Sequence, residues 1–430
     1  MSSDTSVRTL LFLQGPPSGF FKALGQEFQR RGHRVRRINV SIGDWLLWHG
    51  RDTISYRGRF EDWAAWLDAF IVREGITDIL YYGDRLPYHR PAREIAIARG
   101  LGAYAVEFGY LRPDWITIER GGLGTLSHFP TDPETIRQIA RGEPRPDPTR
   151  HYRHTFAQEA VGEMVYSLSN VFLKPAFPHY HADFYYHPVL DYVSWLPRLI
   201  NGRRNRKHAE RVVQDVVTCG RPYFVFPLQR QNDYQIRINS PYVHLKDALE
   251  ETLRSFRDHA PADARFVVKI HPLDNGMERW TSVVPKLVRS LGLEGRVELI
   301  DGGDLSRLLI HARGTVLVNS TVGLHAIQAG CPLKVLGVAV YDIDGLSFQG
   351  PLDDFWTQSP HPDPSFRAAF VRALALATQV KGDFYAEPGR SAAAEAIAER
   401  ILTGQVNEPG AFVDPPPRLE RAHALGMSVL

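Results

Sequence analysis

Polar side chains of the kinds that carry out acid–base and anion-binding chemistry follow short apolar segments at four places in this 430-residue chain. In open α/β sheets, ligands bind outside the carboxyl ends of the strands, so residues directly after a strand are the first candidates for a site. The four groups are Glu107, Asp233, the pair Lys269 and His271, and the pair Ser320 and Thr321.

Two of these groups are carboxylates that could serve as a general acid or base. Glu107 lies in an apolar stretch, where partial desolvation would raise its pKa toward neutrality. The alternative is a structural Glu107 that pairs with Arg112. Asp233 follows an apolar segment and lies among amide side chains, which can orient a carboxylate and hold sugar hydroxyls. The alternative for Asp233 is a polar loop that caps the next helix. The amides are Gln229, Gln231, Asn232 and Gln235.

The other two groups could bind an anion. Lys269 and His271 are two residues apart, so they share one face if the strand VVKIHP extends that far. A cation and an imidazole there could bind a phosphate leaving group and protonate it, or His271 could be a hydrogen-bonded turn residue. Ser320 and Thr321 stand where a strand ends and a helix begins, which forms an anion site or an ordinary N-cap. Together, the four groups suit glycosyl transfer from an activated phospho-sugar.

Alternating strand and helix signals in both halves of the chain predict the elements that would position these groups. In the first half, strand signals at 8–14, 33–40, 77–84 and 102–110 alternate with helical patterns. In the second half, strand signals recur at 222–229, 265–272, 296–301, 315–320 and 332–337. The pattern predicts an α/β protein with two Rossmann-like domains, each built on a parallel sheet and facing a central cleft, as in GT-B-like glycosyltransferases.

The domain boundaries follow from these signals. We expect a Rossmann-like acceptor-side domain over 1–150 and a helical connector over 151–215. A Rossmann-like domain that binds the sugar nucleotide is expected over 216–375. A C-terminal helix and a loosely ordered Pro-rich tail are expected over 376–430.

Composition and missing motifs exclude several classes of function. A net charge of +3, from 51 basic and 48 acidic side chains, argues against a generic nucleic-acid binder. Two cysteines exclude a disulfide scaffold and a cysteine-based zinc site, and the 17 histidines show no metal-ligand spacing. No Walker loop, GxGxxG fingerprint or membrane-spanning stretch is found. The start of the chain lacks the pattern of a signal peptide, so we expect a cytoplasmic protein. We also expect that the protein works without a cofactor.

The chain resembles the capsular polysaccharide biosynthesis and export family of Gram-negative bacteria, the KpsS/LipB-like proteins, which are regarded as β-Kdo transferases. The resemblance covers most of residues 8–350 and rests on motifs that occur in one order. They are FLQGPPSGFF (12–21), RRINVSIGDW (36–45), YRGRFEDW (56–63), ITDILYYGDRLPYHRPA (76–92), GYLRPDWITIE (109–119), PLQRQNDYQI (227–236), KIHP (269–272) and NSTVGLHAIQAG (319–330).

The resemblance implies a retaining double displacement with CMP-β-Kdo as donor. The acceptor would be a glycerophospholipid, similar to lysophosphatidylglycerol, or a lipid that already bears Kdo. Asp233 would be the nucleophile and Glu107 the general acid/base, with His271 also catalytic. One departure concerns the residue after Glu107, where the family has a second acid and this chain has Phe108. Donor contacts would come from Gln229, Lys269, His271, Pro272, Ser320, Thr321 and Gly323, and acceptor or sugar contacts from Tyr110, Arg112 and Gln235.

A lipid acceptor requires access to a membrane, and segment 193–207 is a candidate for that contact. It places Trp195, Leu196, Leu199 and Ile200 beside a basic cluster, as suits an anionic membrane surface. The alternative is a solvent-facing interdomain helix with a basic end. We therefore expect a protein that is peripheral on the inner face of the inner membrane, with other capsule assembly proteins as further partners.

Two other functions stay open from the sequence. One is a transferase of the same fold that uses another nucleotide sugar, such as a CMP-sialic acid or a UDP-sugar. The other is an accessory protein of capsule export that has lost catalysis, which the presence of Phe108 makes conceivable.

Overall fold

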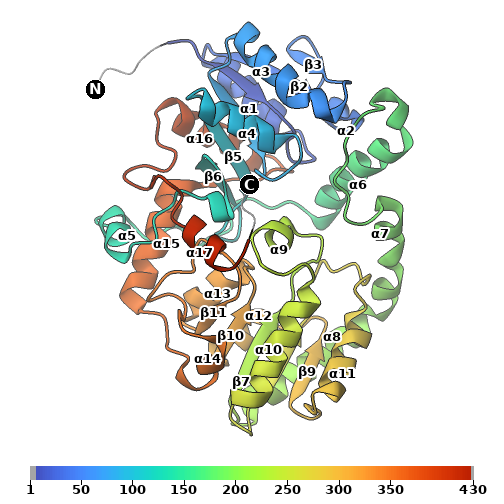
Figure 1. Cartoon of the computed structure of the whole chain (residues 1–430), viewed down its shortest axis with the longest axis vertical. Coiled ribbons are helices and arrows are strands. Elements are labelled where there is room, and N and C mark those ends of the chain that lie inside the picture. Colours follow the sequence, from blue (N-terminus) through green and yellow to red (C-terminus); the bar gives the residue numbers. More distant parts are fainter. Residues whose placement is uncertain (1–5, 428–430) are drawn as a thin grey trace. The chain divides into compact units, whose positions relative to one another are not determined.

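A computed structural model describes residues 6–427, apart from the side chains of Leu196, Leu199 and Ile200. The chain forms two compact units, each of which contains one sheet (Figure 1). Unit 1 comprises Met1–Pro130, Gly142–Phe184 and Val371–Pro417. Unit 2 comprises Thr131–Arg141, Tyr185–Phe370 and Arg418–Leu430.

The sheet of unit 1 has seven strands in the order β12-β6-β5-β4-β1-β2-β3. The five strands from β5 to β3 are parallel, whereas β6 runs antiparallel to β5 and β12 antiparallel to β6. The strands are β1 (Thr9–Phe12), β2 (Arg34–Asn39), β3 (Thr53–Ser55), β4 (Asp78–Tyr82), β5 (Gly102–Phe108), β6 (Trp115–Arg120) and β12 (Gln379–Lys381).

Helices cover both faces of this sheet because alternate strand residues point to opposite faces. In β1, Leu10 and Phe12 join one buried cluster with residues of α1 and α16, whereas Leu11 joins a second cluster with residues of α3 and α4. The helices of unit 1 are α1 (Phe20–Arg30), α2 (Ile42–Leu47), α3 (Trp63–Glu74), α4 (His89–Ala98), α6 (Phe156–Phe172) and α16 (Gly389–Leu402).

A buried ion pair joins β2 to α2. Arg37 and Asp44 are 2% and 0% exposed and lie 3.0 Å apart between Nη2 and Oδ1. Ser41 is the N-cap of α2 and forms a capping box with Asp44. The Nε of Arg37 also donates to Asn39 at 2.9 Å, so both charges are held by several hydrogen bonds rather than by each other alone.

The sheet of unit 2 has five strands, all parallel, in the order β11-β10-β7-β8-β9. They are β7 (Tyr223–Pro227), β8 (Arg265–Lys269), β9 (Val297–Ile300), β10 (Gly314–Leu317) and β11 (Leu333–Val335). The helices are α5 (Pro133–Ile139), α7 (Pro188–Ser194), α8 (Leu196–Thr218), α9 (Tyr234–Ile238), α10 (Leu245–His259), α11 (Trp280–Ser290), α12 (Leu305–His311), α13 (Val322–Ala329), α14 (Leu352–Gln358) and α17 (Leu419–Ala424). Helix α15 (Pro364–Thr378) begins in unit 2 and ends in unit 1.

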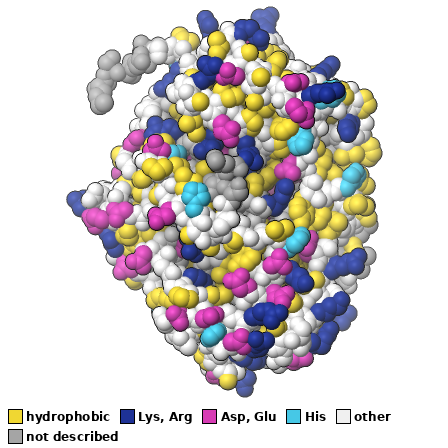
Figure 2. Space-filling view, in the orientation of Figure 1, with side chains coloured by type: hydrophobic (Ala, Val, Ile, Leu, Met, Phe, Trp, Pro, Cys, Tyr) yellow, Lys and Arg dark blue, Asp and Glu magenta, His cyan; other side chains and the backbone are white. Residues whose placement is uncertain are grey.

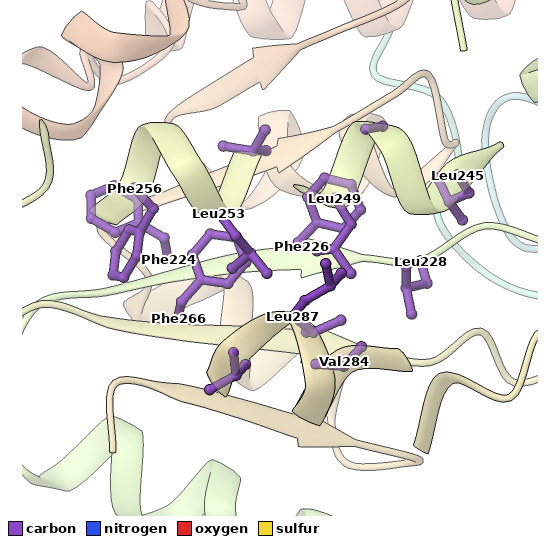
Figure 3. Close-up of a cluster of buried hydrophobic side chains, with 14 of the residues drawn as sticks. Phe224, Phe226, Leu228, Leu245, Leu249, Leu253, Phe256, Phe266, Val284 and Leu287 are labelled. Atoms are coloured by element: carbon purple, nitrogen blue, oxygen red, sulfur yellow. The ribbon is translucent and has the colours of Figure 1, made fainter. Parts of the chain in front are cut away.

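The main core of unit 2 lies between this sheet and α10 and α11 (Figure 3). Leu245, Leu249, Leu253 and Phe256 recur at helical spacing and are fully buried, so α10 presents one apolar face to the sheet. Burying a side chain of this size stabilises the fold by about 1.5–3 kcal/mol. The carboxyl ends of β7, β8 and β10, which carry the candidate residues, are thereby fixed in place.

The prediction of an α/β protein with two Rossmann-like domains is confirmed. The expectation that both sheets are parallel is wrong for unit 1, because β6 and β12 are antiparallel there. The compact units also cross the predicted domain boundaries, since β12 and α16 belong to unit 1 and α5 to unit 2. The C-terminal segment is packed rather than loose: Val406 and Ala411 are buried. Across residues 6–427, no helix is long and apolar enough to span a bilayer.

Candidate active site

The candidate residues of unit 2 gather at one edge of its sheet. Strands β10, β7 and β8 are neighbours and run parallel, so the loops that follow them leave the sheet at the same edge. The N–H of Leu228, directly after β7, donates to the carbonyl of Lys269 at 2.8 Å. The structure therefore brings together the predicted residues on the loops after these three strands.

Asp233 is the N-cap of α9, and its carboxylate accepts a hydrogen bond from the N–H of Gln235 at 2.9 Å. This is the helix-capping geometry considered as the alternative for this residue. Burial raises the pKa of Asp233, and the Gln235 hydrogen bond and the charge of Arg230 oppose that rise. Arg230 was not singled out from the sequence, although it lies three residues before Asp233. A carboxylate held in this way has a fixed orientation and a raised basicity, which also suit a nucleophile.

A buried amide network holds α9 against the end of β10. Both amide atoms of Gln229 contact Asn319: Gln229 Nε2 donates to Asn319 Oδ1 at 3.0 Å, and the N–H of Asn319 donates to Gln229 Oε1 at 3.2 Å. Asn319 Nδ2 donates to the carbonyls of Gln235 and Asn239 at 2.7 and 2.8 Å. Gln235 Oε1 accepts from Asn239 at 3.0 Å. These contacts give Gln229 and Gln235 a positioning role, and their predicted contacts with sugar or donor stay predictions.

Lys269 and His271 lie at the end of β8 and after it. Lys269 is 6% exposed, and burial lowers the pKa of its ammonium group, although the charge of Asp301 opposes that shift. Burial also lowers the pKa of His271 to about 4, and the nearby charges of Arg230, Lys269 and Arg198 act in the same direction.

The structure gives His271 a hydrogen-bonding role, and its expected role as a proton donor stays a prediction. Its Nδ1 accepts a hydrogen bond from the N–H of Leu273 at 3.0 Å. The neutral ring then carries its proton on Nε2 and can donate a hydrogen bond to an anion. With a pKa of about 4, it is uncharged near neutral pH and is a poor general acid there. Strand β8 ends at Lys269, so the expectation that the strand continues to His271 and is ended by Pro272 is wrong, and both residues lie in the following loop.

Arg198 positions the loop that carries His271, and the sequence reasoning missed this role. Its guanidinium, on α8, donates to the carbonyls of His271 and Asp274 and pairs with the carboxylate of Asp301. Asn205, two turns further along α8, donates to the other oxygen of Asp301 at 3.0 Å. Arg198 lies in the stretch interpreted as a membrane contact, and no local pattern distinguishes it from the other arginines there.

Ser320 and Thr321 precede α13, as predicted. Ser320 Oγ accepts from the N–H of Val322 at 3.2 Å, and the carbonyl of Ser320 accepts from the hydroxyl of Tyr341. Thr321 is the N-cap residue of α13, but its side chain makes no capping hydrogen bond. A Cβ on Gly323 would lie 2.3 Å from the ring of Tyr341. Close packing against Tyr341 thus leaves no room for a side chain at Gly323, and its contact with the donor stays a prediction.

Helix α8 presents different side chains on two faces. Its inner face carries Arg198, Asn205, Ala209 and Val213, of which the last two are buried. Basic side chains gather in the part of unit 2 where Figure 1 labels α8 and α11 (Figure 2). The side chains of Leu196, Leu199 and Ile200 lie outside those described, whereas Trp195 is half-buried and the guanidinium of Arg198 lies 5.7 Å from its ring centroid. The α8 basic cluster consists of the exposed residues Arg203, Arg204, Arg206 and Lys207.

In unit 1, Glu107 is half-buried near the end of β5 and lies opposite Thr117 of β6. Burial is the main cause that raises the pKa of Tyr110, and the charges of Glu119 and Glu107 add to it. Desolvation by the surrounding protein lowers the pKa of Arg112, and the charge of Glu107 is among those that oppose this shift. The carboxylate of Glu107 therefore interacts electrostatically with Tyr110 and Arg112. This agrees both with a role as general acid or base and with a structural pairing with Arg112.

Glu119 is a buried carboxylate that the sequence reasoning did not identify. It is 0% exposed and accepts hydrogen bonds from the hydroxyl of Tyr110 at 3.0 Å and from the hydroxyl of Ser127. The hydroxyl of Tyr110 is thus directed to Glu119, so its predicted contact with a sugar would require it to leave this partner. Alternation of apolar and polar residues in WITIE, with Thr117 and Glu119 between and after the two isoleucines, was the available signal for a strand with Glu119 on it.

Phe108 points to the opposite face of the sheet from Glu107, because the two are consecutive in a strand. Its ring packs against Phe384 with ring centroids 5.2 Å apart, and the guanidinium of Arg112 lies over it at 5.4 Å. A second acid at position 108 would therefore lie on the side of the sheet away from Glu107. Within the part of the chain that the structure describes, no group of three or more His, Cys, Asp or Glu side chains could hold a metal ion.

Comparison with known proteins gives consistent matches over most of the chain. Residues 77–385 match the model of a family described as capsule polysaccharide biosynthesis protein. The capsule polysaccharide export protein KpsS of Escherichia coli is 31% identical over 385 residues, which are 88% of this chain and 97% of that protein. The capsule polysaccharide modification protein LipB of Neisseria meningitidis serogroup A is 30% identical over 391 residues, which are 89% of this chain and 93% of that protein.

Among solved structures, the β-Kdo 2,7 transferase of KpsC from Thermosulfurimonas dismutans is similar to this chain. The match has a TM-score of 0.46 and 14% identity, and covers 92% of this chain and 99% of that one.

Proposed function

Because the chain belongs to the capsule polysaccharide biosynthesis protein family, we propose that it is a retaining glycosyltransferase that transfers Kdo from CMP-β-Kdo to a lipid acceptor. The acceptor is a glycerophospholipid similar to lysophosphatidylglycerol, or a lipid that already bears Kdo. The observation that carries the proposal is the position of the Asp233 carboxylate, which is fixed as the N-cap of α9. The same edge of the sheet carries the buried Lys269, the neutral imidazole of His271 and the start of α13. That set combines a nucleophile with groups that bind a phosphate.

Unit 2 binds the donor in this proposal. Lys269, the Nε2–H of His271 and the residues Ser320 and Thr321 contact the phosphate of CMP. These groups neutralise the developing charge on the leaving phosphate, so departure requires no proton from His271. The donor sugar already carries a carboxylate at its anomeric carbon, which repels a second carboxylate. The charges of Lys269 and Arg230 reduce that repulsion at Asp233.

The reaction proceeds in two displacements. In the first, Asp233 attacks the anomeric carbon, a glycosyl ester forms, and CMP leaves with the bonding electron pair. In the second, Glu107 of unit 1 removes the proton from the acceptor hydroxyl. The acceptor oxygen attacks the same carbon and releases the Asp233 carboxylate. Two inversions give net retention of configuration.

The acceptor is a lipid, so the enzyme acts as a peripheral protein on the inner face of the inner membrane. The α8 basic cluster supports this location, because exposed arginines and lysine are attracted to anionic lipid. Other capsule assembly proteins are the further partners in this proposal.

The experiment is incubation of the purified protein with CMP-Kdo, generated in situ, and lysophosphatidylglycerol, followed by mass spectrometry of the lipid. We expect a mass gain of one or more Kdo residues together with CMP release, and loss of both with Asp233→Asn. Asp258→Asn, at an exposed position on α10, is the matched control and keeps activity. Release of UDP from a UDP-sugar in place of CMP would favour another donor. Capsule assembly that survives Asp233→Asn in cells would favour a non-catalytic export role.

A further inference from the structure

A pocket of about 180 Å³ is lined by residues of unit 1 alone. Three segments that are distant in the sequence form it: the end of β5 with the turn into β6, residues 150–154, and the residues that follow β12. We call it the β5–β6 pocket. Its polar lining residues are Arg112, Asp114, Arg150, Tyr152, His154 and Asp383.

The two carboxylates of the β5–β6 pocket are satisfied by the protein itself. Asp114 accepts from Lys381 Nζ at 2.7 Å and from the N–H groups of His151 and Tyr152 at 2.6 and 2.9 Å. Asp383 accepts from the imidazole of His154 and from the backbone N–H groups that begin the next turn. Both carboxylates therefore hold the walls together, and Asp114 is in addition paired with the charge of Lys381.

The two guanidiniums that line the pocket are not engaged in this way. Arg150 donates through Nε to the carbonyl of Tyr152 at 3.2 Å, and Arg112 lies over the ring of Phe108. Among residues 6–427, neither side chain lies within 4.0 Å of a carboxylate oxygen. The pocket therefore offers two cationic groups with unused N–H donors, which is the arrangement that binds the oxygens of a phosphate.

The remaining walls and the size restrict the ligand further. Phe108, Trp115, Ile116 and Phe384 supply apolar surface beside the guanidiniums. The pocket volume of about 180 Å³ is below the roughly 300–1,000 Å³ of pockets that bind larger organic ligands, which favours a small ligand. A phosphate with a short carbon chain fits both the charge and the apolar wall.

We propose that the β5–β6 pocket binds the phosphate of a glycerophosphate headgroup and so positions the lipid acceptor. The inference rests on the proposed function, since it concerns the acceptor of that reaction. Arg112 relates the pocket to the proposed reaction, because it lines the pocket beside the carboxyl end of β5, the strand that carries Glu107. Phe108 and Ile116 line the pocket on the sheet face opposite Glu107, so a glycerol hydroxyl on the bound phosphate would reach Glu107 around the end of β5.

The first test measures binding without any reaction. Glycerophosphate is titrated into the full-length protein and followed by phosphorus NMR. We expect saturable binding that Arg150→Gln weakens about ten- to a hundredfold, as expected for loss of a charge-assisted contact. Arg150→Lys, which keeps the charge and loses the planar fork, should have an intermediate effect. Arg145→Gln, an exposed arginine five residues earlier, is the matched control and should leave binding unchanged.

The source of the anion is identified by two further probes. Inorganic phosphate that binds as tightly as glycerophosphate would overturn the headgroup assignment, because the carbon chain would then contribute nothing. Free Kdo that binds in place of glycerophosphate would overturn it in favour of a sugar carboxylate. No saturable binding, or equal effects of Arg150→Gln and Arg145→Gln, would also overturn the proposal.

The second test uses transfer to lysophosphatidylglycerol. Arg150→Gln should raise KM for this acceptor by the factor seen in binding and leave KM for the CMP-sugar unchanged. An unchanged acceptor KM in an active enzyme would contradict the pocket assignment while the proposed function stands. Glycerophosphate binding without any sugar transfer would contradict the proposed function and leave the phosphate pocket itself supported.

Discussion

Replacing Asn319 by Ala tests whether the amide network positions Asp233. Asn319 is 5% exposed, and its side chain makes three hydrogen bonds, to the side chain of Gln229 and to two carbonyls of α9 and its C-cap. A typical intramolecular hydrogen bond contributes about 0.5–1.5 kcal/mol, and a buried partner left without one costs about 1–3 kcal/mol. Water that enters the space left by the side chain will satisfy part of the network. We therefore expect a loss of about 2–4 kcal/mol in the free energy of unfolding of unit 2.

The functional consequence is specific to α9. Loss of Asn319 frees this short helix, which has only five residues and carries Asp233 as its N-cap. We expect the rate of CMP release from CMP-Kdo to fall by at least tenfold under conditions in which the variant is fully folded. Unfolding is followed in urea by circular dichroism, and CMP release by a coupled assay. Gln229→Ala should be partly non-additive with Asn319→Ala, because the two residues share two hydrogen bonds.

The control is Asn201→Ala on α8. Asn201 is exposed and donates one hydrogen bond to the carbonyl of Pro197 at 2.9 Å, so its loss should change stability by no more than about 0.5 kcal/mol. Equal stability and equal CMP release for the two variants would refute the view that Asn319 fixes the position of α9.

Three further predictions follow from particular contacts. Because burial raises the pKa of Asp233, the rate of CMP release should fall with decreasing pH at a midpoint above the ordinary aspartate value of about 3.9. Arg230→Gln should move this midpoint to still higher pH, and a shift to lower pH would contradict the cause assigned. Asp44→Asn should destabilise unit 1 by about 3–5 kcal/mol in urea unfolding, since it leaves the buried charge of Arg37 uncompensated; a loss below 1 kcal/mol would be inconsistent with this. Changing the α8 basic cluster to Gln should abolish salt-sensitive sedimentation with anionic vesicles and leave neutral vesicles unaffected, and undiminished binding would exclude the cluster as a membrane contact.

Most strands and helices could be predicted because their signals are local. The helical spacing of Leu249, Leu253 and Phe256 and the apolar strand before Pro227 require no knowledge of the fold. Strand β12 could not be predicted in this way, because it has three residues and its partner β6 lies more than 250 residues earlier in the chain. Because β12 pairs with β6, the helix α16 that follows it also belongs to unit 1. This is why unit 1 extends beyond the domain predicted over 1–150.

The family resemblance predicted from the motifs is confirmed by the match over residues 77–385. The location of the unit 2 candidates was also predictable, because parallel strands bring their carboxyl ends to one edge. The roles of individual residues were not, because they depend on partners far away in the sequence. Gln229 contacts Asn319, Arg198 holds the loop of His271, and Tyr341 fills the space that Gly323 leaves. The expectation that Glu107 and Asp233 meet across one cleft stays a prediction.

The most direct test of the account is to trap the glycosyl ester on Asp233. The Glu107→Gln variant, which has lost the base for the second displacement, is mixed with CMP-Kdo and lysophosphatidylglycerol, quenched in acid and digested. Peptide mass spectrometry then searches for a Kdo residue. The account predicts one Kdo on the peptide that contains Asp233, absent from the Asp233→Asn variant. Kdo on a different residue, or rapid transfer to the lipid by Glu107→Gln with no covalent species, would contradict it.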